Sequence, residues 1–373
     1  MSDDEALRAL RAELDRIDHE LLGLAHRRLA VVAQIKDHKR ATGRHLFDRT
    51  REQEVYRRAE AHAQEIGLDP ELACALLRQL IEASHRLQET PGDDEATSAS
   101  RRILIVGGRG KMGTMLGAAF AARGHALEVI DEGDRVDPSV VSAADVVMVA
   151  VPMAHAEEVV ALYAPLVRED ALLCDINSLK ADVCVALAES RGEALGTHPM
   201  FGPTVRSLRR QKVVLCDVKP GPMSAWWQAE LGRMGAEVIR CSPEHHDAMM
   251  SIVQVLTHFG IIAMGRALRA TGYPLASSLP YTSPIYRLEL AMVGRLFSQK
   301  PELYFEIMRG NPQGEAVRAT FLREAQALCD ALADDDGDAF VQAFLEVRDY
   351  FADEAERSME LSDQIIETTM ARP

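Results

Sequence analysis

The chain of 373 residues lacks the marks of several protein classes. Its six cysteines are scattered, with no C-x-x-C pair and no short Cys/His ligand spacing. This pattern excludes a disulfide framework and a zinc site, and it predicts buried thiols and no metal. Basic residues are in deficit, because 42 Lys and Arg face 57 Asp and Glu, for a net charge of −15. A nucleic-acid partner would require a basic face, so none is predicted.

A long apolar segment is missing as well. The N-terminal sequence MSDDEALRAL is acidic and lacks the apolar core of a signal peptide. The most apolar run, Ile252 to Met264, is interrupted by Gln254 and His258 and is too short to cross a bilayer. These absences predict a cytoplasmic protein with no membrane partner.

The sequence that is present changes character twice along the chain. The segment ETPGDDEATSAS, residues 89–100, combines Pro, Gly, small polar residues and acids, which is typical of a linker. Helical patterns precede it, from Asp4 to Arg40, from Asp48 to Ile66, and from Asp69-Pro70 onward. The runs ILIVGG, ALEVID, DVVMVAVP and ALLCDI then alternate with helical stretches, which predicts a parallel sheet. From about Pro243 the pattern is helical again.

We therefore predict a multidomain protein. It has an all-α domain at 1–90, a linker at 91–100, a Rossmann-type α/β domain at 101–242 and an all-α domain at 243–373.

The first predicted helix places cations on its apolar stripe. Positions that repeat at intervals of four and three include Leu7, Leu14 and Leu21, but also Arg11, Arg28 and Lys39. One interpretation is that the helix drifts, so that each cation reaches water at the edge of the stripe. Burying several cations is costly without compensating anions, so an anionic ligand explains the whole set better.

The same helix is too long for a domain of ninety residues. At 1.5 Å per residue, about 37 residues extend roughly 55 Å. A partner chain is needed to cover it, which predicts an intertwined homodimer.

A glycine-rich turn indicates a dinucleotide site. Gly108, Gly110 and Gly113 form G-x-G-x-x-G in RILIVGGRGKMG, after a β-branched strand and before a helical run. The first glycine is expected to permit the tight turn, the second the approach of a pyrophosphate, and the third close helix–strand contact. Lys111 and Met112 belong to the same motif, and Gly107, just before it, is expected to serve the turn only.

Asp131 follows at about the distance expected for an acid that binds the ribose hydroxyls, although a solvated strand end is the alternative. No arginine follows Asp131 directly, which favours NAD over NADP. Arg135, a little further along, leaves that preference open.

The stretch GTHPMFGP holds His198 between glycines and prolines, and we read it as a stiff turn that aims the imidazole. A turn histidine that bonds its own loop is the alternative. The preceding DINSLK brings Ser178 and Lys180 to the carboxyl end of a strand, where such sheets bind ligands. We expect His198 at the same edge as a general base, with Ser178 orienting it or joining its relay.

Polar residues also interrupt the C-terminal helical pattern. His245 and His246 lie in the first turn of one helix, and Arg295 lies on an apolar stripe of another. His245 is interpreted as solvated. A core role for His258 and a structural ion pair for Arg287 remain alternatives to ligand binding.

The N-terminal constellation resembles the all-helical chorismate mutases from Leu7 to Gln88. The matching residues are Arg11, Arg28, Lys39, Asp48, Arg51, Glu52, Ser84 and Gln88. The resemblance implies rearrangement of chorismate to prephenate, with Arg28 and a partner chain's Arg11 gripping two carboxylates. It further implies that Lys39 and Gln88 address the ether oxygen, Arg51 and Glu52 the hydroxyl end, and Ser84 a carboxylate, whereas Asp48 is also a helix cap.

The remainder resembles the prephenate dehydrogenases. GGRGKMG, DINSLK, LGTHPMFGP, EHHD and TSPIYRLELAMVGRLF occur in the family's order. The resemblance implies NAD-dependent oxidative decarboxylation of prephenate to 4-hydroxyphenylpyruvate, with His198 accepting the ring hydroxyl's proton. Arg295 would hold a carboxylate, His246 is the better match to a second site histidine, and Arg287 is a further substrate-binding candidate.

The joined arrangement is similar to the bifunctional chorismate mutase/prephenate dehydrogenases of tyrosine biosynthesis. The resemblance also implies a possible tyrosine effector, acting near His258 and Tyr304. Two alternatives remain: a dehydrogenase for arogenate or another β-hydroxy acid, and a chain in which one site is vestigial.

Overall fold

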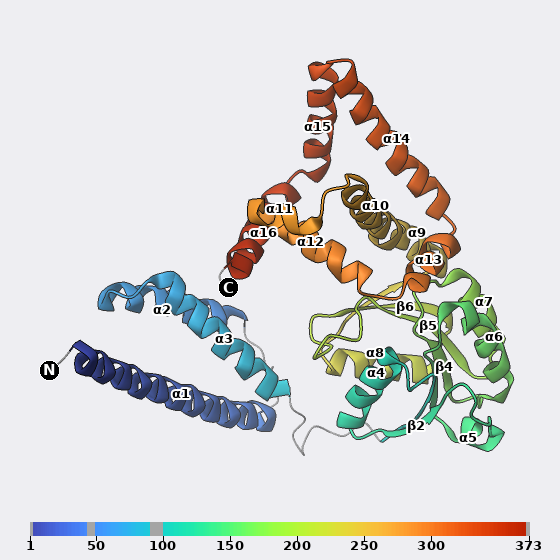
Figure 1. Cartoon of the computed structure of the whole chain (residues 1–373). Helices are drawn as coiled ribbons and strands as arrows, with labels where there is room; N and C mark the ends of the chain where they lie inside the picture. Colours follow the sequence, from blue (N-terminus) through green and yellow to red (C-terminus); the bar gives the residue numbers. More distant parts are fainter. Residues whose placement is uncertain (1–2, 43–48, 90–99, 371–373) are drawn as a thin grey trace. The chain divides into compact units, whose positions relative to one another are not determined.

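The computed structural model describes residues 3–42, 49–89 and 100–370 (Figure 1). The chain divides into two compact units, Met1–Ser100 and Arg101–Pro373.

The first unit contains three long helices: α1 (Asp3–Ala41), α2 (Arg49–Ile66) and α3 (Pro70–Glu89). Helix α3 starts where the sequence predicts, because the Oδ1 atom of Asp69 accepts the backbone N–H of Glu71 at 3.0 Å and Pro70 occupies the first helical position. Helix α3 packs against both α1 and α2.

The apolar stripe of α1 is open in the single chain. Leu7, Leu14, Leu21 and Ile35 are 47%, 59%, 54% and 43% exposed. Leaving such side chains in water forgoes the free energy of burial. This exposure supports the prediction that a second chain covers α1.

The second unit is built on a seven-stranded sheet with the order β2-β1-β3-β4-β5-β6-β7. The strands are β1 (Arg102–Val106), β2 (Ala126–Ile130), β3 (Val146–Val149), β4 (Leu172–Asp175), β5 (Glu193–Pro199), β6 (Lys212–Lys219) and β7 (Glu237–Cys241). Strands β1 to β5 are parallel, so their carboxyl ends share one edge. Because the strand order reverses beside β1, the ligand crevice is expected there.

Two details differ from the sequence-based expectation. The pair β5·β6 is antiparallel, because the chain returns through a loop rather than a crossover helix. The predicted turn at His198 is wrong, since His198 lies within β5 and is 2% exposed. Extended geometry before a proline, which the sequence did predict, suits a strand equally well.

Helices cover both faces of the sheet. Helices α5 (Pro138–Ala143), α6 (Met153–Tyr163) and α7 (Ala181–Ala188) enclose one core, and the short helix η1 (Ala164–Leu166) follows α6. Helices α4 (Lys111–Ala122) and α8 (Pro222–Arg233) enclose the other, where the rings of Phe120 and Trp227 stack at 4.8 Å.

The rest of the second unit is helical (Figure 1). Its elements are α9 (Pro243–Met250), the π-helical segment η2 (Ser251–Leu256), α10 (Thr257–Ala270), α11 (Leu275–Ser278), the 3-10 turn η3 (Leu279–Tyr281), α12 (Pro284–Phe297), α13 (Pro301–Gly310), α14 (Gly314–Ala333), α15 (Gly337–Phe351) and α16 (Glu354–Met370).

Elements α9, η2 and α10 form one helix, Pro243–Ala270, of 28 residues. By length and apolar composition alone, this helix could cross a membrane. The sequence-based prediction considered only Ile252 to Met264 and so underestimated the length of the apolar helix. However, its first turns carry His246 and Asp247, each 1% exposed and hydrogen-bonded to residues of β5 and α7. We therefore assign it to the folded helical domain.

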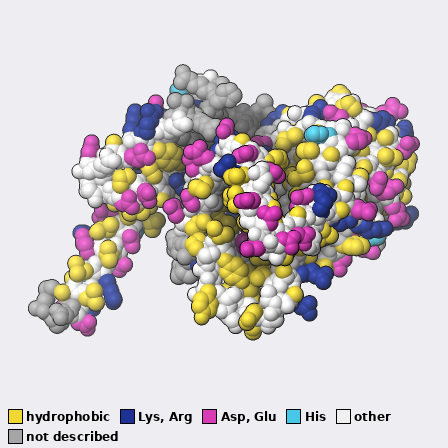
Figure 2. All heavy atoms as spheres, turned by 90° about the horizontal axis from the view of Figure 1, so that it is seen from above, with side chains coloured by type: hydrophobic (Ala, Val, Ile, Leu, Met, Phe, Trp, Pro, Cys, Tyr) yellow, Lys and Arg dark blue, Asp and Glu magenta, His cyan; other side chains and the backbone are white. Residues whose placement is uncertain are grey.

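Apolar side chains remain exposed on the C-terminal helices. A groove of about 790 Å³ between α14 and α15 is lined by Leu328, Phe340, Phe344 and Val347, among others. Figure 2 shows hydrophobic side chains lying between acidic groups on the surface in view.

The cysteines are all free. Cys174, Cys184 and Cys216 are buried as predicted, but Cys329 is exposed, so a buried thiol was the wrong prediction there.

Gly192 provides a test of the packing beneath the sheet. A Cβ at this position would collide with the backbone oxygens of Arg168 and Ala171, which cannot rotate away. Gly192→Ala should lower the free energy of unfolding by about 1–3 kcal/mol. Both tryptophans of the chain, Trp226 and Trp227, lie in α8, so denaturant titration followed by their fluorescence reports on this domain.

Gly232→Ala is the control, because its Cβ would meet nothing within 4 Å inside helix α8. It should stabilise by about 0.5–1 kcal/mol. If Gly192→Ala and Gly232→Ala changed the free energy of unfolding equally, the proposed backbone collision at Gly192 would be wrong.

Candidate active sites

The first candidate site lies between α1 and α3. The NH1 atom of Arg28 donates to the Oγ atom of Ser84 at 2.7 Å and to the carbonyl of Leu80 at 3.0 Å. Ser84 is 6% exposed, and burial lowers the pKa of Arg28, while the nearby Tyr56 opposes that shift. A guanidinium has five N–H donors, more than these two bonds use. The structure thus joins two predicted residues from different helices.

The other predicted residues of this site are less enclosed in one chain. Arg11 is exposed, Lys39 is half-buried, and Arg51 bonds Glu54 at 2.9 Å. The expected role of Arg11 in a second chain's pocket stays a prediction. Asp48 lies outside the described residues.

The side chains of Glu52 and Gln88 also lie outside what the structure describes. In α1, Lys36 is also buried, with an exposure of 8%.

The second candidate site begins at the glycine-rich turn. The positive φ of +81° belongs to Gly107, which was expected to serve the turn, whereas Gly108, which was expected to permit it as well, has no positive φ. A Cβ on Gly108 would lie 2.7 Å from the Cγ1 atom of Val129, and one on Gly113 would lie 2.7 Å from the Cα atom of Gly108. Gly113 therefore permits close contact of the following helix with the turn after β1, whereas contact with the strand itself was predicted.

Helix α4 presents its N-terminus to the same place. Its N-cap, Gly110, offers no side-chain cap, and Lys111 and Met112 form the first turn. Backbone N–H groups at such a helix start bind phosphate. At the end of β2, Asp131 accepts the backbone N–H of Arg109 at 2.8 Å and of Glu132 at 2.9 Å. These features fit a dinucleotide.

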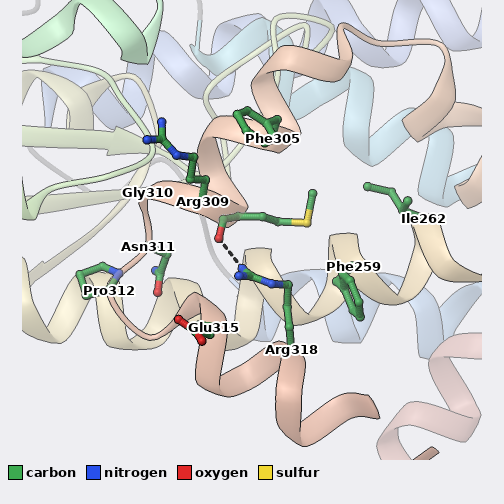
Figure 3. Close-up of a pocket in the computed structure, with 10 residues that line it drawn as sticks. Phe259, Ile262, Phe305, Arg309, Gly310, Asn311, Pro312, Glu315 and Arg318 are labelled. Carbon is green, nitrogen blue, oxygen red and sulfur yellow. Dashed lines mark hydrogen bonds between the residues drawn. The ribbon is translucent and has the colours of Figure 1, made fainter.

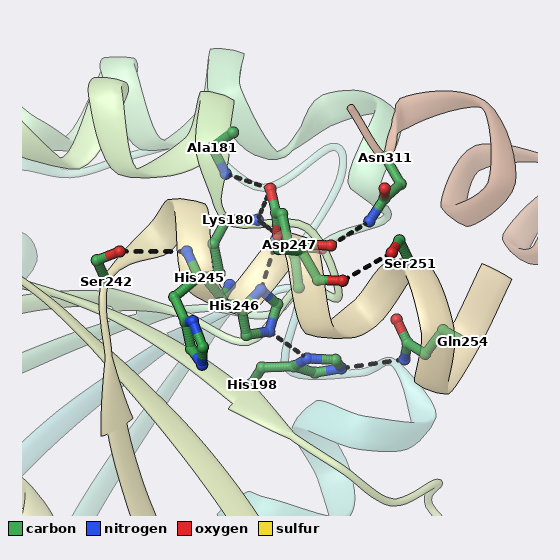
Figure 4. A network of polar contacts seen from close by, with 12 residues as sticks. Lys180, Ala181, His198, Ser242, His245, His246, Asp247, Ser251, Gln254 and Asn311 are labelled. Carbon is green, nitrogen blue, oxygen red and sulfur yellow. Dashed lines mark hydrogen bonds and ion pairs between the residues drawn. The ribbon is translucent and has the colours of Figure 1, made fainter. Parts of the chain in front are cut away.

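A chain of hydrogen bonds runs into His198 (Figure 4). Asp247 bonds the Nδ1 atom of His246 at 2.7 Å, and the Nε2 atom of His246 lies 2.8 Å from the Nδ1 atom of His198. Asp247 also accepts the backbone N–H groups of Lys180 at 3.0 Å and Ala181 at 2.9 Å. The relay thus joins α9 to the start of α7 and to β5.

The relay selects the tautomers of both histidines. As an ionised acceptor, Asp247 requires a proton on the Nδ1 atom of His246. The Nε2 atom of His246 then accepts a hydrogen bond from the Nδ1–H group of His198. The Nε2 atom of His198 is left with a lone pair and can act as a base.

This geometry changes the interpretation of His246. The residue is 1% exposed and bonded on both sides within the relay, so it positions His198, and the predicted direct binding of substrate by His246 loses support. His245 is exposed, as expected.

A buried ion pair lies beside the relay. The Nζ atom of Lys180 contacts the Oδ2 atom of Asp175 at 2.5 Å, and both side chains are fully buried. Asp175 also accepts the backbone N–H of Thr197 at 3.2 Å, which ties it to β5. Burial, then the charge of Lys180 and the proximity of His246, lower the pKa of His198 well below its ordinary value. His198 is therefore neutral at pH 7.

The π-helical segment η2 brings another group to His198. The Nε2 atom of Gln254 lies 3.4 Å from the Nε2 atom of His198, and the Oε1 atom of Gln254 is buried without a hydrogen-bond partner among the described residues. π-Helical turns occur often at functional sites. Ser178 is half-buried in the segment before α7, and its predicted bond to His198 stays a prediction.

His258 lies one helical turn beyond Gln254, and it contacts a second residue named in the sequence analysis, Tyr304. The rings of His258 and Tyr304 contact edge to face, with centroids 4.9 Å apart. Burial raises the pKa of Tyr304, and the charge of nearby Arg295 opposes this. Arg295 and Arg287 are both exposed.

A cavity of about 690 Å³ lies between α10, α13 and α14 (Figure 3). Phe259 and Phe305 form part of its wall, and Arg318 donates to the carbonyl of Met308. Asn311 at its edge donates to the backbone carbonyl of Asp247 at 2.7 Å. The cavity therefore adjoins the residue that holds the backbone of Asp247, the first member of the relay.

Among the described residues, no group of three or more His, Cys, Asp and Glu side chains is placed to hold a metal ion.

The fold and this site define a dinucleotide-dependent dehydrogenase joined to a separate helical domain. Residues 10–89 match the family Chorismate mutase type II, 113–229 match the nucleotide-binding domain of prephenate dehydrogenase, and 242–346 match its dimerization domain. The chain is 33% identical to the T-protein of Haemophilus influenzae over 98% of both chains, and 34% identical to that of Enterobacter agglomerans over 94% of both.

The chain belongs to the T-protein family, the bifunctional chorismate mutase/prephenate dehydrogenases. It is both an isomerase and an NAD-dependent oxidoreductase of tyrosine biosynthesis. Its fold is similar to that of the A. aeolicus prephenate dehydrogenase solved with hydroxyphenyl propionate and NAD+, with a TM-score of 0.56 at 19% identity over 71% of this chain and 99% of that one.

Asp247→Asn should disable the relay. With its amide oxygen at the Oδ2 position, asparagine would still accept the backbone N–H groups of Ala181 at 2.9 Å and Lys180 at 3.3 Å. Its amide nitrogen, at the Oδ1 position, would then donate to the Nδ1 atom of His246 and reverse both tautomers. A proton would then occupy the Nε2 atom of His198. NADH formation from prephenate should fall by about 10²- to 10⁴-fold.

Asp182→Asn removes an exposed carboxylate from the first turn of α7 and is the matched control. Its rate should match that of the unsubstituted enzyme, and chorismate consumption should persist in both variants. An active Asp247→Asn enzyme would contradict the tautomer assignment.

Proposed function

We propose how individual residues carry out the two reactions. In the helical domain, Arg28, supported by Ser84, binds a carboxylate of chorismate, and Arg11 of a second chain binds the other. Lys39 and Gln88 stabilise the developing charge on the ether oxygen, and Arg51 and Glu52 hold the hydroxyl end, with Asp48 as a further substrate contact. The rearrangement needs no general base, so positioning and electrostatic stabilisation suffice.

In the dehydrogenase, the Nε2 atom of His198 takes the proton of the ring hydroxyl of prephenate. Asp247 and His246 fix the tautomer, and Ser178 helps to orient the reacting groups. When bound, NAD supplies the hydride acceptor, and loss of the ring carboxylate as carbon dioxide gives 4-hydroxyphenylpyruvate. The relay from Asp247 to His198 is the observation that carries this assignment.

Substrate carboxylates lie toward Arg295 in this proposal, with Arg287 as a second candidate. Gln254 reaches His198, and His258 lies one helical turn further along the same helix. The ring of His258 contacts Tyr304, which lies close enough to Arg295 to be affected by its charge. A molecule with a hydroxyl at one end and a carboxylate at the other matches that order of groups.

The dinucleotide is held by Gly108, Gly110, Lys111, Met112, Gly113 and Asp131. The backbone at the start of α4 would bind the pyrophosphate, and Asp131 the ribose hydroxyls. The glycine contacts described above support this assignment.

We also propose that the enzyme is a cytoplasmic homodimer. The exposed stripe of α1 and the match of 242–346 to a dimerization domain support the assembly. A soluble biosynthetic enzyme suits that location. Tyrosine is a candidate effector at His258 and Tyr304, where the Nδ1 atom of His258 is buried without a partner among the described residues.

His198→Asn should separate the two activities. Without its base, the dehydrogenase should lose about 10²- to 10⁴-fold in NADH formation, while chorismate consumption changes by less than about twofold. The assay supplies chorismate and NAD and measures chorismate consumption and NADH formation in the same reaction. Equal loss of both activities in a folded variant would refute the assignment.

Arg28→Ala should have the opposite effect. Loss of a charged donor to a substrate carboxylate should slow chorismate consumption by about 10²- to 10³-fold. NADH formation should be unchanged when prephenate is supplied directly. Arg27→Ala, which removes an exposed neighbouring arginine, is the control and should leave both rates unchanged. A matching loss in Arg27→Ala would show a general charge effect instead.

A further inference from the structure

The rim of the dinucleotide site contains an arginine that the proposed function does not use. Arg109 lies inside the glycine-rich motif, between Gly108 and Gly110. Its backbone N–H donates to Asp131, so its side chain starts one residue from the carboxylate assigned to the ribose. An arginine near that carboxylate is the feature by which Rossmann-type domains accept the 2′-phosphate of NADP.

Asp134 engages this arginine. The NH2 atom of Arg109 lies 2.7 Å from the Oδ2 atom of Asp134. The same oxygen accepts the backbone N–H of Asp131 at 2.9 Å, and the N–H of Asp134 donates to the carbonyl of Asp131 at 3.0 Å. Gly133, with a φ of +87°, permits the turn that folds Asp134 back. The loop therefore fixes Asp134 before any ligand binds.

Arg135, the other arginine of this loop, acts on a different carboxylate. The charge of Arg135 acts on Asp137, whose side chain caps α5 by accepting the N–H of Ser139 at 2.9 Å. Arg109 is thus the cation bonded to the loop that carries Asp131.

We propose that Asp134 sets the preference for NAD over NADP by holding Arg109 away from the position of a 2′-phosphate. The inference rests on the proposed dinucleotide site. In the unsubstituted enzyme a 2′-phosphate meets the carboxylates of Asp131, Glu132 and Asp134, while the guanidinium is already engaged. Without the charge of Asp134, Arg109 is released and can pair with the phosphate, a strong charge-assisted interaction.

Asp134→Asn is the direct test, because the amide oxygen can still accept the N–H of Asp131 while the charge is lost. The full-length protein is titrated calorimetrically with 2′,5′-ADP and with 5′-AMP at one ionic strength. Affinity for 2′,5′-ADP should rise by about 10- to 100-fold, and affinity for 5′-AMP should change by less than about threefold. The ratio of kcat/KM for NADP to that for NAD should rise in parallel.

Two further variants identify the cause. Asp137→Asn removes an equal charge from the same loop without touching Arg109, and asparagine remains a good helix cap, so the affinity for 2′,5′-ADP should not rise. Arg109→Gln combined with Asp134→Asn should lose the gain.

An unchanged affinity in Asp134→Asn, an equal gain in Asp137→Asn, or a gain that survives in the double variant would each overturn the inference. If neither the unsubstituted protein nor any variant binds 5′-AMP or NAD, the dinucleotide site itself is wrong, and this inference falls with it.

Discussion

The dehydrogenase half depends on the carboxylate of Asp247. It accepts two backbone N–H groups at the start of α7, where the helix dipole favours a negative charge, and it also fixes the ring of His246. Asn311 holds the backbone of the same residue from the loop after α13. The buried carboxylate therefore joins the sheet domain to the C-terminal helices. Through His246 it also determines which nitrogen of His198 is free to accept a proton. The price of burying this charge is met by those hydrogen bonds.

Charge is used in the same way elsewhere in the chain. Lys180 and Asp175 are buried as a pair beside His198. Burial of His198 and the charge of Lys180 lower the pKa of this histidine, so that it stays neutral at pH 7. In the mutase half, Arg28 is held by Ser84 and by a carbonyl of α3. Each site thus aims its ionic groups with packed partners before a substrate arrives, which reduces the cost of reorganisation during reaction.

Much of this organisation was predictable from local patterns. Asp69 and Pro70 start α3 as expected, and the glycine-rich motif lies between a strand and a helix. The relay was not predictable, because Asp247 and His198 are far apart in sequence, and their contact depends on how α9 packs on the sheet. Arg109 was overlooked because its importance lies in an ion pair across two loops, which no spacing rule describes.

The sequence by itself determined the order of domains, the glycine cradle and the residue types needed for each reaction, because these follow from periodicity, turn chemistry and short motifs. Only the tertiary structure decided that His198 lies in a strand and that His246 supports it. Local propensity cannot specify such features. The tautomer of His198 and the partners of strand β5 are set by contacts between segments that are distant in the chain.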